Sequence, residues 1–411
     1  MKSAWEIERI REFKKLDHNT EADICIIGGG LAGVWSAYLL SKEGKEVILI
    51  EKDKVGRAAT LYTTAFITQV IDTDLTDLIE MFGSDRARLS WQAGADAIDQ
   101  IADFIKYEGI ECEFVRLPMC SYSDRKRDLD KLHREAAAAT RLGFEAGVSH
   151  KPIAGFENAV SMVVPNQAKY HPMKFFKALV NAAVSSGVKI YEDTEAVEVS
   201  GEDPVIVNTK EKNSIKVRDV IVATYEPLNN PKPTHWKKGM YETYVYELEL
   251  PKGAIPEMMC EDLRNPYHYF RVDDLGDKMR MIAGGEDHRA ELKFEESKSF
   301  RALKEFIVKT FPKIEYEVVT RWHGGILEPS DGLSLIGEYA PHQYVASAFS
   351  GNGMTYSAIT GRILTDLIME RGSEYEELYD PKRRLMGKPV LYKFRDYAEE
   401  FLGGAVKNLF K

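Results

Sequence analysis

Two periodicities of apolar residues along the chain predict where its strands and helices lie. Residues 22–27 and 46–50 are short apolar runs typical of buried strands, and residues 31–43 between them carry apolar side chains at helical spacing. Strand, helix and strand within about 30 residues make a βαβ unit, the building block of a parallel sheet. After a charged N-terminal stretch, the sequence therefore predicts the start of an α/β domain.

The later pattern predicts a separate antiparallel sheet inserted into this domain. Residues 241–250 and 267–285 alternate like antiparallel strands, with a helix at 296–310 behind them. Three earlier runs predict a meander of strands that leads back into the parallel sheet, at 188–200, 204–210 and 214–224. Further helices are predicted at 84–107, 128–146, 170–187 and 354–370.

The residues between the first strand and the first helix, "CIIGGGLAG" at 25–33, contain the pattern G-x-G-x-x-G. Gly28 permits a tight turn, Gly30 lets a pyrophosphate approach the backbone, and Gly33 lets helix pack on strand. The helix N-terminus offers free N–H groups to phosphates. Glu51, 23 residues beyond Gly28, can accept hydrogen bonds from a ribose but would repel a 2′-phosphate. These residues predict a dinucleotide site, and the alternative is an ordinary turn with a surface glutamate.

A second junction of strand, glycine turn and helix lies late in the chain. "YVASAF" at 344–349 is typical of a buried strand, and "SGNG" at 350–353 forms a glycine loop before the helix at 354–370. Residues 54–70, "KVGRAATLYTTAFITQV", are rich in small and hydroxyl side chains and would let a flat group approach the backbone. The two junctions predict a cofactor long enough to reach both. For residues 54–70, a plain connecting loop is the alternative.

Composition and charge exclude several classes of protein. The 411 residues carry a formal net charge of −10 with no basic block, which argues against a nucleic-acid partner. The cysteines, Cys25, Cys112, Cys120 and Cys260, show no metal-binding spacing, so neither a metal site nor a disulfide framework is expected. No apolar run reaches the roughly 18 residues of a transmembrane helix. We expect a soluble cytoplasmic protein whose stretch at 390–410 packs on the domain or on a second subunit.

Three motifs in this order resemble the FAD-dependent oxidoreductases of the D-amino-acid oxidase superfamily, which also holds glycine, sarcosine and γ-glutamylputrescine oxidases. They are "DICIIGGGLAGVWSAYLL…VILIEK", "YHPMKFFKALVNAAVSSGVKIYEDTEAVEV" and "YVASAFSGNGMTYSAITGRILTDLI". The resemblance covers most of residues 20–370. "RAATLYTTAFITQ" and "FSGNGMTY" are most similar to the flavoprotein module of proteins that elsewhere carry a Rieske iron–sulfur domain. This sequence has no Cys-x-His pair, so we expect no such cluster.

The resemblance implies an α/β fold in which a Rossmann-like FAD-binding domain carries an inserted antiparallel-sheet substrate domain. We expect FAD-binding parts at 21–105, 151–227 and 319–371. The other segments are an N-terminal extension at 1–20, substrate-domain parts at 106–150 and 228–318, and a helical tail at 372–411. The implied FAD contacts are Gly28, Gly30, Leu31, Ala32, Gly33, Glu51, Lys52, Arg57, Ala58, Ala59, Thr60, Thr64, Ala65, Val197, Ala223, Thr224, Gly325, Gly351, Asn352, Gly353, Met354 and Thr355. Tyr62 stands where some relatives have a histidine linked covalently to flavin, so we expect non-covalent FAD.

Substrate contacts are expected from the inserted sheet and from the segment around His323. Alternate residues of a strand share a face, so Tyr269 and Arg271 can point together into a cavity, with Tyr246 as a further candidate. His323 is expected in a loop at the flavin. Packed aromatic rings, a solvated arginine and a structural histidine are the alternatives. Where the D-amino-acid oxidases have an arginine for the substrate carboxylate, this sequence has Ile326, which puts free α-amino acids in doubt.

The activity implied by the resemblance is oxidation of the C–N bond of an amine or amino-acid-like small molecule. A hydride leaves the carbon that bears nitrogen, and the imine then hydrolyses, so the cofactor performs the chemistry and no catalytic triad is required. Two alternatives are an NAD-linked dehydrogenase, which would be colourless, and a flavoprotein that relays electrons to a partner or a quinone. The oligomeric state and the electron acceptor are left open.

Overall fold

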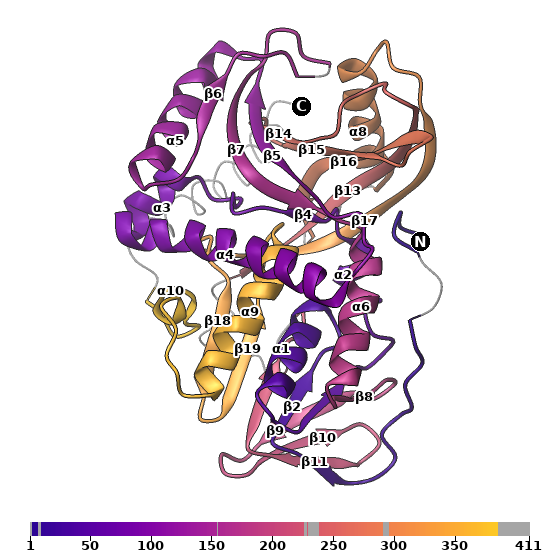
Figure 1. The fold of residues 1–411 in the computed structure, drawn as a ribbon, viewed down its shortest axis with the longest axis vertical. Helices are drawn as coiled ribbons and strands as arrows, with labels where there is room; N and C mark the ends of the chain where they lie inside the picture. The colour runs from indigo at the N-terminus through magenta and orange to yellow at the C-terminus, as the bar shows by residue number, and fades with distance from the viewer. Residues whose placement is uncertain are drawn as a thin grey trace, which may run out of the picture.

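The computed structural model describes residues 2–6, 10–153, 155–225, 228, 238–290 and 296–384. A six-stranded sheet with the order β18-β19-β12-β2-β3-β8 lies in the lower half of Figure 1. Its strands are β2 (Ile24–Ile27), β3 (Val47–Ile50), β8 (Lys189–Tyr191), β12 (Asp219–Val222), β18 (Leu335–Ala340) and β19 (Gln343–Ser347). Neighbouring strands pair in parallel except β18, which is antiparallel to β19. The predicted βαβ unit is confirmed, with helix α1 at Leu31–Lys42.

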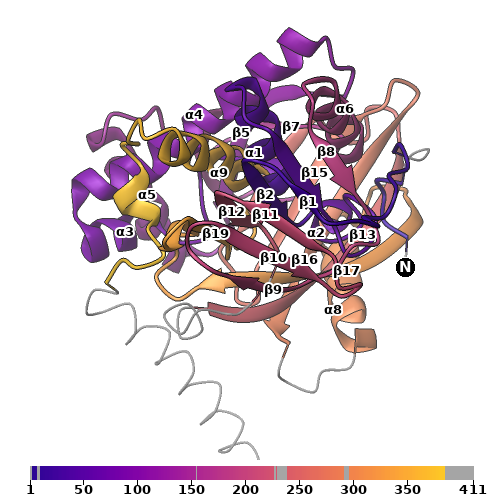
Figure 2. The same ribbon diagram turned by 90° about the horizontal axis from the view of Figure 1, so that it is seen from below.

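Both faces of this sheet are covered, because alternate side chains along β2 pack into two different hydrophobic cores. Ile24 and Ile26 pack into the large core formed with the helices, whereas Cys25 and Ile27 pack into a second core. A four-stranded sheet with the order β1-β11-β10-β9 supplies the other half of that second core. Its strands are β1 (Thr20–Glu21), β9 (Ala196–Ser200), β10 (Val205–Thr209) and β11 (Ser214–Val217). Figure 2 shows the helices on one side of the parallel strands and β9 and β10 on the other.

The described helices include the six that the sequence pattern predicts, one of which ends early, whereas the helices at Ala59–Tyr62 and Leu75–Phe82 were not predicted. In full, the described helices are α1, α2 (Ala59–Tyr62), α3 (Leu75–Phe82), α4 (Ser84–Glu108), α5 (Leu129–Arg141), α6 (Pro172–Ser185), α8 (Glu296–Thr310), α9 (Gly353–Ile368) and α10 (Glu376–Tyr379), with a 3₁₀ turn at Lys126–Asp128. The helix predicted at 128–146 is too long. Gly143 has a φ of +91°, and the Phe144 N–H bonds back to the Ala139 carbonyl at 3.0 Å, which ends the helix.

A large sheet with the order β17-β13-β16-β15-β14-β5-β7-β4 forms the upper half of Figure 1. Its strands are β4 (Phe66–Ile67), β5 (Val115–Ser123), β7 (Val160–Lys169), β13 (Lys238–Pro251), β14 (Met258–Asp262), β15 (His268–Asp274), β16 (Lys278–Arg289) and β17 (Glu317–Pro329), and β6 (Gly147–Ser149) pairs with β7. The expected boundaries gave β7 and β17 to the nucleotide-binding part. Their pairing with β5 and β13 puts them in the large sheet instead.

The N-terminal extension runs between the two halves of the molecule. In Figure 1 residues 2–6 lie beside β17, and residues 10–21 descend along the right-hand side to the small sheet at the bottom, where β1 pairs with β11. The Leu16 N–H donates to the Thr194 hydroxyl at 3.1 Å on the way. The stretch at 390–410, expected to pack on the domain or on a partner, lies outside the described residues. Within the described parts of the chain, no helix has the length and apolar character needed to cross a bilayer.

Candidate cofactor and substrate site

The carboxyl ends of four parallel strands meet at one edge of the six-stranded sheet. β2 is followed by Gly28, β3 by Glu51, β12 by Ala223 with Thr224, and β19 by Ala348. In open α/β sheets this edge is where ligands bind. The fold thus brings together the two glycine junctions, which are far apart in the sequence.

Close backbone approaches explain two of the three glycines in the first junction. Gly28 has a φ of +115°, and a Cβ on it would lie 2.6 Å from the Ala223 carbonyl oxygen. A Cβ on Gly33 would lie 2.0 Å from the Gly28 carbonyl oxygen. Gly30 has more room, because a Cβ there would have the Thr60 hydroxyl as its nearest neighbour at 3.6 Å. The backbone beside Gly30 therefore leaves space for a ligand.

Glu51 organises the loops at this edge. One of its carboxylate oxygens accepts the Gly29 N–H at 2.7 Å, and the other accepts the Asp53 N–H at 2.9 Å. The Thr60 hydroxyl accepts the Leu31 N–H at 3.1 Å and so holds the first turn of α1, in which Ala32 is buried. Other residues expected at the cofactor are exposed here, namely Lys52, Arg57, Ala58, Ala59 and Val197. Each oxygen of Glu51 keeps a further acceptor position, so a contact to a ribose is compatible with these bonds.

The backbone that leads from β19 into the late glycine loop is strained, which the sequence did not reveal. Ala348 and Ser350, which are not glycines, have φ values of +61° and +50°. Such conformations cost about 1 to 3 kcal/mol each and are concentrated at functional sites. Asp72 helps to hold this loop, because its carboxylate accepts the Gly351 N–H at 2.9 Å. Asp72 follows β4 and was not among the predicted site residues.

Three side chains expected to face the flavin bond to the protein itself. The Asn352 amide donates to the Val70 carbonyl at 3.0 Å, and the Met354 sulfur accepts the Tyr170 hydroxyl at 3.3 Å. The Thr355 hydroxyl donates to the Thr68 carbonyl at 3.1 Å. Beside these residues, Gly353 starts α9, and a Cβ built on it would have no described atom within 4 Å outside its own chain neighbours and helix backbone. The space for a ligand at this junction is therefore next to the backbone of Gly353.

The four residues expected to contact the substrate lie on opposite faces of the large sheet. Tyr246 packs in the core against α8 and donates to the Phe300 carbonyl at 3.2 Å. His323 lies within β17, not in a loop, and its ring is 5.9 Å from that of Tyr244 in the same layer. Tyr269 belongs to the other face, where its hydroxyl is 3.2 Å from the Thr243 hydroxyl. Because strand residues alternate, Tyr246 and His323 cannot share a cavity with Tyr269.

Arg271 shares the face of Tyr269 but is fully engaged by the protein. It is 1% exposed, and its guanidinium donates to the carbonyls of Thr64 at 3.2 Å, Ala65 at 2.8 Å and Tyr170 at 3.0 Å. It also donates to the carboxylate of Asp273 at 3.0 Å. These contacts correct the expectation that Arg271 binds the substrate. Thr64 and Ala65, expected at the cofactor, are held by Arg271 from their carbonyl side, while Gly325 is exposed in β17.

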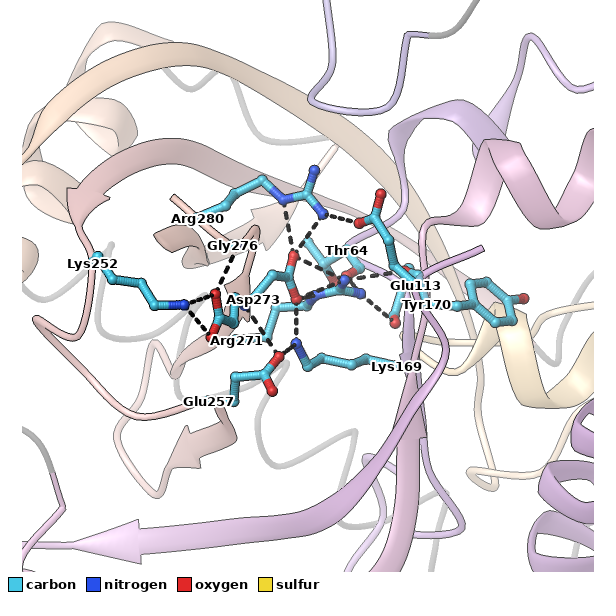
Figure 3. Close-up of polar contacts among 12 residues, drawn as sticks. Thr64, Glu113, Lys169, Tyr170, Lys252, Glu257, Arg271, Asp273, Gly276 and Arg280 are labelled. Carbon is cyan, nitrogen blue, oxygen red and sulfur yellow. Dashed lines mark hydrogen bonds and ion pairs between the residues drawn. The ribbon is translucent and has the colours of Figure 1, made fainter. Parts of the chain in front are cut away.

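Arg271 is part of a buried charge network that Figure 3 shows between β15 and β7. Asp273 lies at its centre and accepts from Arg271, from Arg280 Nη2 at 2.8 Å and from Lys169 Nζ at 2.7 Å. Burial opposes the charge on Asp273, but Arg271, Arg280 and Lys169 outweigh that effect and hold its pKa far below 3.8. The network fixes the large sheet against the loop at 64–65.

A cavity of about 230 Å³ opens beside Asp72 and reaches Ser121 near the end of β5 and the end of β14. Its lining includes the five carboxylates of Asp72, Asp74, Glu135, Glu261 and Asp262, but only the two cations of Lys131 and Arg264. Both cations are paired, Lys131 with Asp74 at 2.6 Å and Arg264 with Asp124 at 2.8 Å. Burial raises the pKa of the Glu261 carboxyl to about 7, against a hydrogen bond from Ser121 that lowers it. The cavity thus favours a positively charged guest.

The residues at the sheet edge fit FAD. The first junction provides a helix N-terminus with space beside Gly30, and Glu51 lies where a ribose is expected. At the second junction the side-chain oxygen Oδ1 of Asn352 is buried and has no partner among the described residues, which suits an N–H of a flavin. The open space beside Gly353 suits the flat ring.

Comparison with known proteins identifies the family. Residues 23–367 match the family described as FAD dependent oxidoreductase. The chain is 31% identical over 401 residues to "Putative Rieske 2Fe-2S iron-sulfur protein YhfW" of Bacillus subtilis, which covers 96% of this chain and 78% of that protein. It is 22% identical to the gamma-glutamylputrescine oxidoreductase of Escherichia coli, over 87% of this chain and 85% of that protein. The structure of glycine oxidase from Geobacillus kaustophilus superposes with a TM-score of 0.75 at 18% identity, over 89% of this chain and 100% of that one. The chain belongs to the family of FAD-dependent oxidoreductases that contains the amine and amino-acid oxidases.

Proposed function

We propose that this protein binds FAD non-covalently along the edge of the parallel sheet and oxidises the C–N bond of a small amine that carries positive charge. One observation carries the proposal: both glycine junctions lie at the same sheet edge, and the space beside Gly353 adjoins, through Asp72, the acidic cavity. When bound there, FAD supplies the acceptor for the hydride that leaves the carbon bearing nitrogen. The residues of the chain bind and orient the amine.

The charges of the cavity support an amine and argue against a free amino acid. The guanidinium of Arg271 donates its hydrogen bonds to backbone carbonyls and to Asp273. The guanidinium of Arg264 is paired with Asp124 and Asp262. These arginines are therefore not available to hold a substrate carboxylate. Glu261, by contrast, accepts the Ser121 hydroxyl at 2.6 Å and has no cation partner among the described residues. A substrate ammonium would supply the charge that a buried carboxylate needs.

Glu261 has a second property that suits this role. With a pKa of about 7, its carboxyl can exchange a proton near neutral pH, so it can take a proton from a bound ammonium group. Asp287, hydrogen-bonded by Tyr267 at the cavity wall, also has a pKa raised to about 7 by burial. The amine that reacts must be neutral, and Glu261, which lines the cavity, provides an acceptor for the proton that the amine loses.

Anaerobic bleaching of the flavin absorbance tests the proposal. The panel compares primary and secondary amines with a distal ammonium group against matched D- and L-amino acids. We expect bleaching with the amines, and weaker bleaching when Glu261→Gln removes the charge. Bleaching by amino acids alone would contradict the charge argument, and no bleaching by either class would contradict the activity. Acid precipitation should release the yellow colour into the supernatant, whereas colour in the pellet would show a covalent linkage.

A second candidate function is favoured by one comparison. The similarity to the protein named "Putative Rieske 2Fe-2S iron-sulfur protein YhfW" extends over 96% of this chain. A flavoprotein that passes electrons to an iron–sulfur partner would fit that similarity. Such a relay would take its electrons from a separate donor protein and not from any amine, so the same bleaching experiment separates the two functions.

A further inference from the structure

The N-terminal extension buries a tryptophan between the large sheet and the loop after α2. Trp5 is 0% exposed. Its ring lies 5.1 Å from the guanidinium carbon of Arg271 and 4.7 Å from that of Arg280, and the ring of His171 meets it edge-on at 5.3 Å. An aromatic face attracts cations, so both arginines help to hold the ring in place. The Thr320 hydroxyl donates to the Lys2 carbonyl at 3.1 Å and gives the segment a second attachment, to β17.

The indole N–H of Trp5 completes a series of hydrogen bonds. It donates to the Thr63 carbonyl at 2.5 Å. The preceding carbonyl, that of Tyr62, accepts the Trp322 indole N–H at 2.9 Å, and the next two accept the guanidinium of Arg271. Four consecutive carbonyls, those of residues 62–65, are thus each bound by a side-chain N–H. We call the three donors, Trp5, Arg271 and Trp322, the carbonyl clamp.

The carbonyl clamp fixes the peptide planes of a segment that does not hold its shape by itself. Residues 63–65 lie between the short helix α2 and the two-residue strand β4, so regular structure contributes few hydrogen bonds there. Ala65 has a φ of +58°, which is unfavourable for a residue with a side chain. The donors come from the N-terminal extension, β15 and β17, so the loop keeps its conformation only when these three segments are assembled.

We propose that Trp5 is a positioning residue for the cofactor: it orients residues 62–65, and the affinity for FAD depends on it although it touches neither glycine junction. This inference rests on the proposed cofactor site beside residues 57–65. Loss of one donor leaves one carbonyl without its partner and gives the loop more conformations. FAD binding must then order the loop, and the affinity falls accordingly.

The test replaces Trp5 with phenylalanine, which keeps an aromatic ring near the arginines and removes the N–H. Trp35→Phe is the matched control, because Trp35 is 1% exposed and its indole N–H has no partner among the described residues. Two quantities are measured: the dissociation constant of FAD, from titration of the apoprotein, and hydrogen exchange of the amides at 62–66 in the apoprotein. We expect Trp5→Phe to weaken FAD binding by about 2- to 10-fold and to speed exchange in this loop. Trp35→Phe should change neither quantity.

The outcomes separate this inference from the proposed function. Unchanged exchange and unchanged FAD affinity in Trp5→Phe, with FAD bound normally by the wild type, overturn the inference alone. Faster exchange with unchanged affinity also overturns it, because the loop would then be clamped without serving the cofactor. A wild-type apoprotein that takes up no FAD contradicts the proposed function instead, and the exchange measurement still tests the clamp. Trp5→Ala removes the ring as well and should have a larger effect, but Trp5→Phe decides if that variant fails to fold.

Discussion

Replacing Asp273 with asparagine is expected to destabilise the protein by about 3 to 5 kcal/mol, the usual result of removing one member of a buried ion pair. The substitution keeps the shape of the side chain and removes the charge that Arg271, Arg280 and Lys169 share. Asp273 is 4% exposed, so water cannot replace the lost carboxylate.

The contacts that Arg271, Arg280 and Lys169 keep in the variant indicate a loss of stability in the lower part of this range. Lys169 keeps Glu257 at 2.8 Å, and Arg280 keeps Glu113 at 3.0 Å. Arg271 keeps carbonyl acceptors as its direct partners, which satisfy its N–H groups but not its charge. Arg271 is therefore the one cation of the three that loses the carboxylate it contacts directly, and we expect about 3 kcal/mol.

The next residue provides the control. Asp274 also pairs with a lysine, Lys252 at 2.7 Å, but both side chains are exposed, and Figure 3 shows Lys252 beside the buried network. Asp274→Asn should therefore change stability little. Guanidinium unfolding of both variants at pH 7 and a fixed FAD concentration, followed by tryptophan fluorescence, measures the difference. Equal midpoints for the two variants would refute the reasoning, because the buried cations would then not depend on Asp273. The low pKa of Asp273 makes its contribution independent of pH above about 4, so the same difference is expected at pH 8.

Three further predictions concern the site. Glu51→Ala should weaken FAD binding by about 10- to 150-fold, and an unchanged dissociation constant in a folded variant would remove Glu51 from the site. Gly353→Val should leave the apoprotein as stable as the wild type, because the space around the added Cβ is open. The same substitution should weaken the flavin–sulfite adduct, which the N-terminus of α9 favours. Equal sulfite affinity in the two proteins would place the flavin elsewhere. The raised pKa of Glu261 means that its neutral form stabilises the fold and that this stability is lost as pH rises from about 4.5 to about 7. Glu261→Gln should therefore raise the melting temperature at pH 8 relative to the wild type and not at pH 4.5, and a parallel shift at both values would argue against this titration.

The cofactor half of the molecule was predictable because its determinants are local. Gly28 has a φ of +115°, and a Cβ on Gly33 would lie 2.0 Å from the Gly28 carbonyl oxygen, so both positions require glycine. Strand, turn and helix follow each other directly in the sequence, so the parallel sheet and its edge could be inferred from one stretch of chain. The late junction could be inferred in the same way, although its strained residues, Ala348 and Ser350, carry no sequence signal.

The substrate half was less predictable because its determinants are long-range. Alternation correctly indicates that Tyr269 and Arg271 share a face, but it does not indicate which other groups their side chains contact there. The carbonyls that occupy Arg271 belong to residues about 100 and 200 positions away, at Tyr170 and Thr64. For Tyr246 and His323, the register between β13 and β17 decides the face, and no local pattern fixes that register. A pattern can therefore identify an arginine in a sheet, whereas the fold decides whether it binds a ligand or the protein.

The carbonyl clamp helps to offset the backbone strain in the loops at the proposed cofactor site. Ala65, Ala348 and Ser350 adopt left-handed conformations on the loops that flank the proposed flavin position, at a cost of about 1 to 3 kcal/mol each. Hydrogen bonds to a charged group contribute about 1.5 to 3 kcal/mol each, and Arg271 makes two of them to the carbonyls of Thr64 and Ala65. At the other loop, the Asp72 carboxylate binds the Gly351 N–H. Charged side chains outside the loops thus offset the strain within them. Because those side chains are held in turn by the large sheet and the N-terminal extension, the cofactor site requires the assembled fold and not the glycine motifs alone.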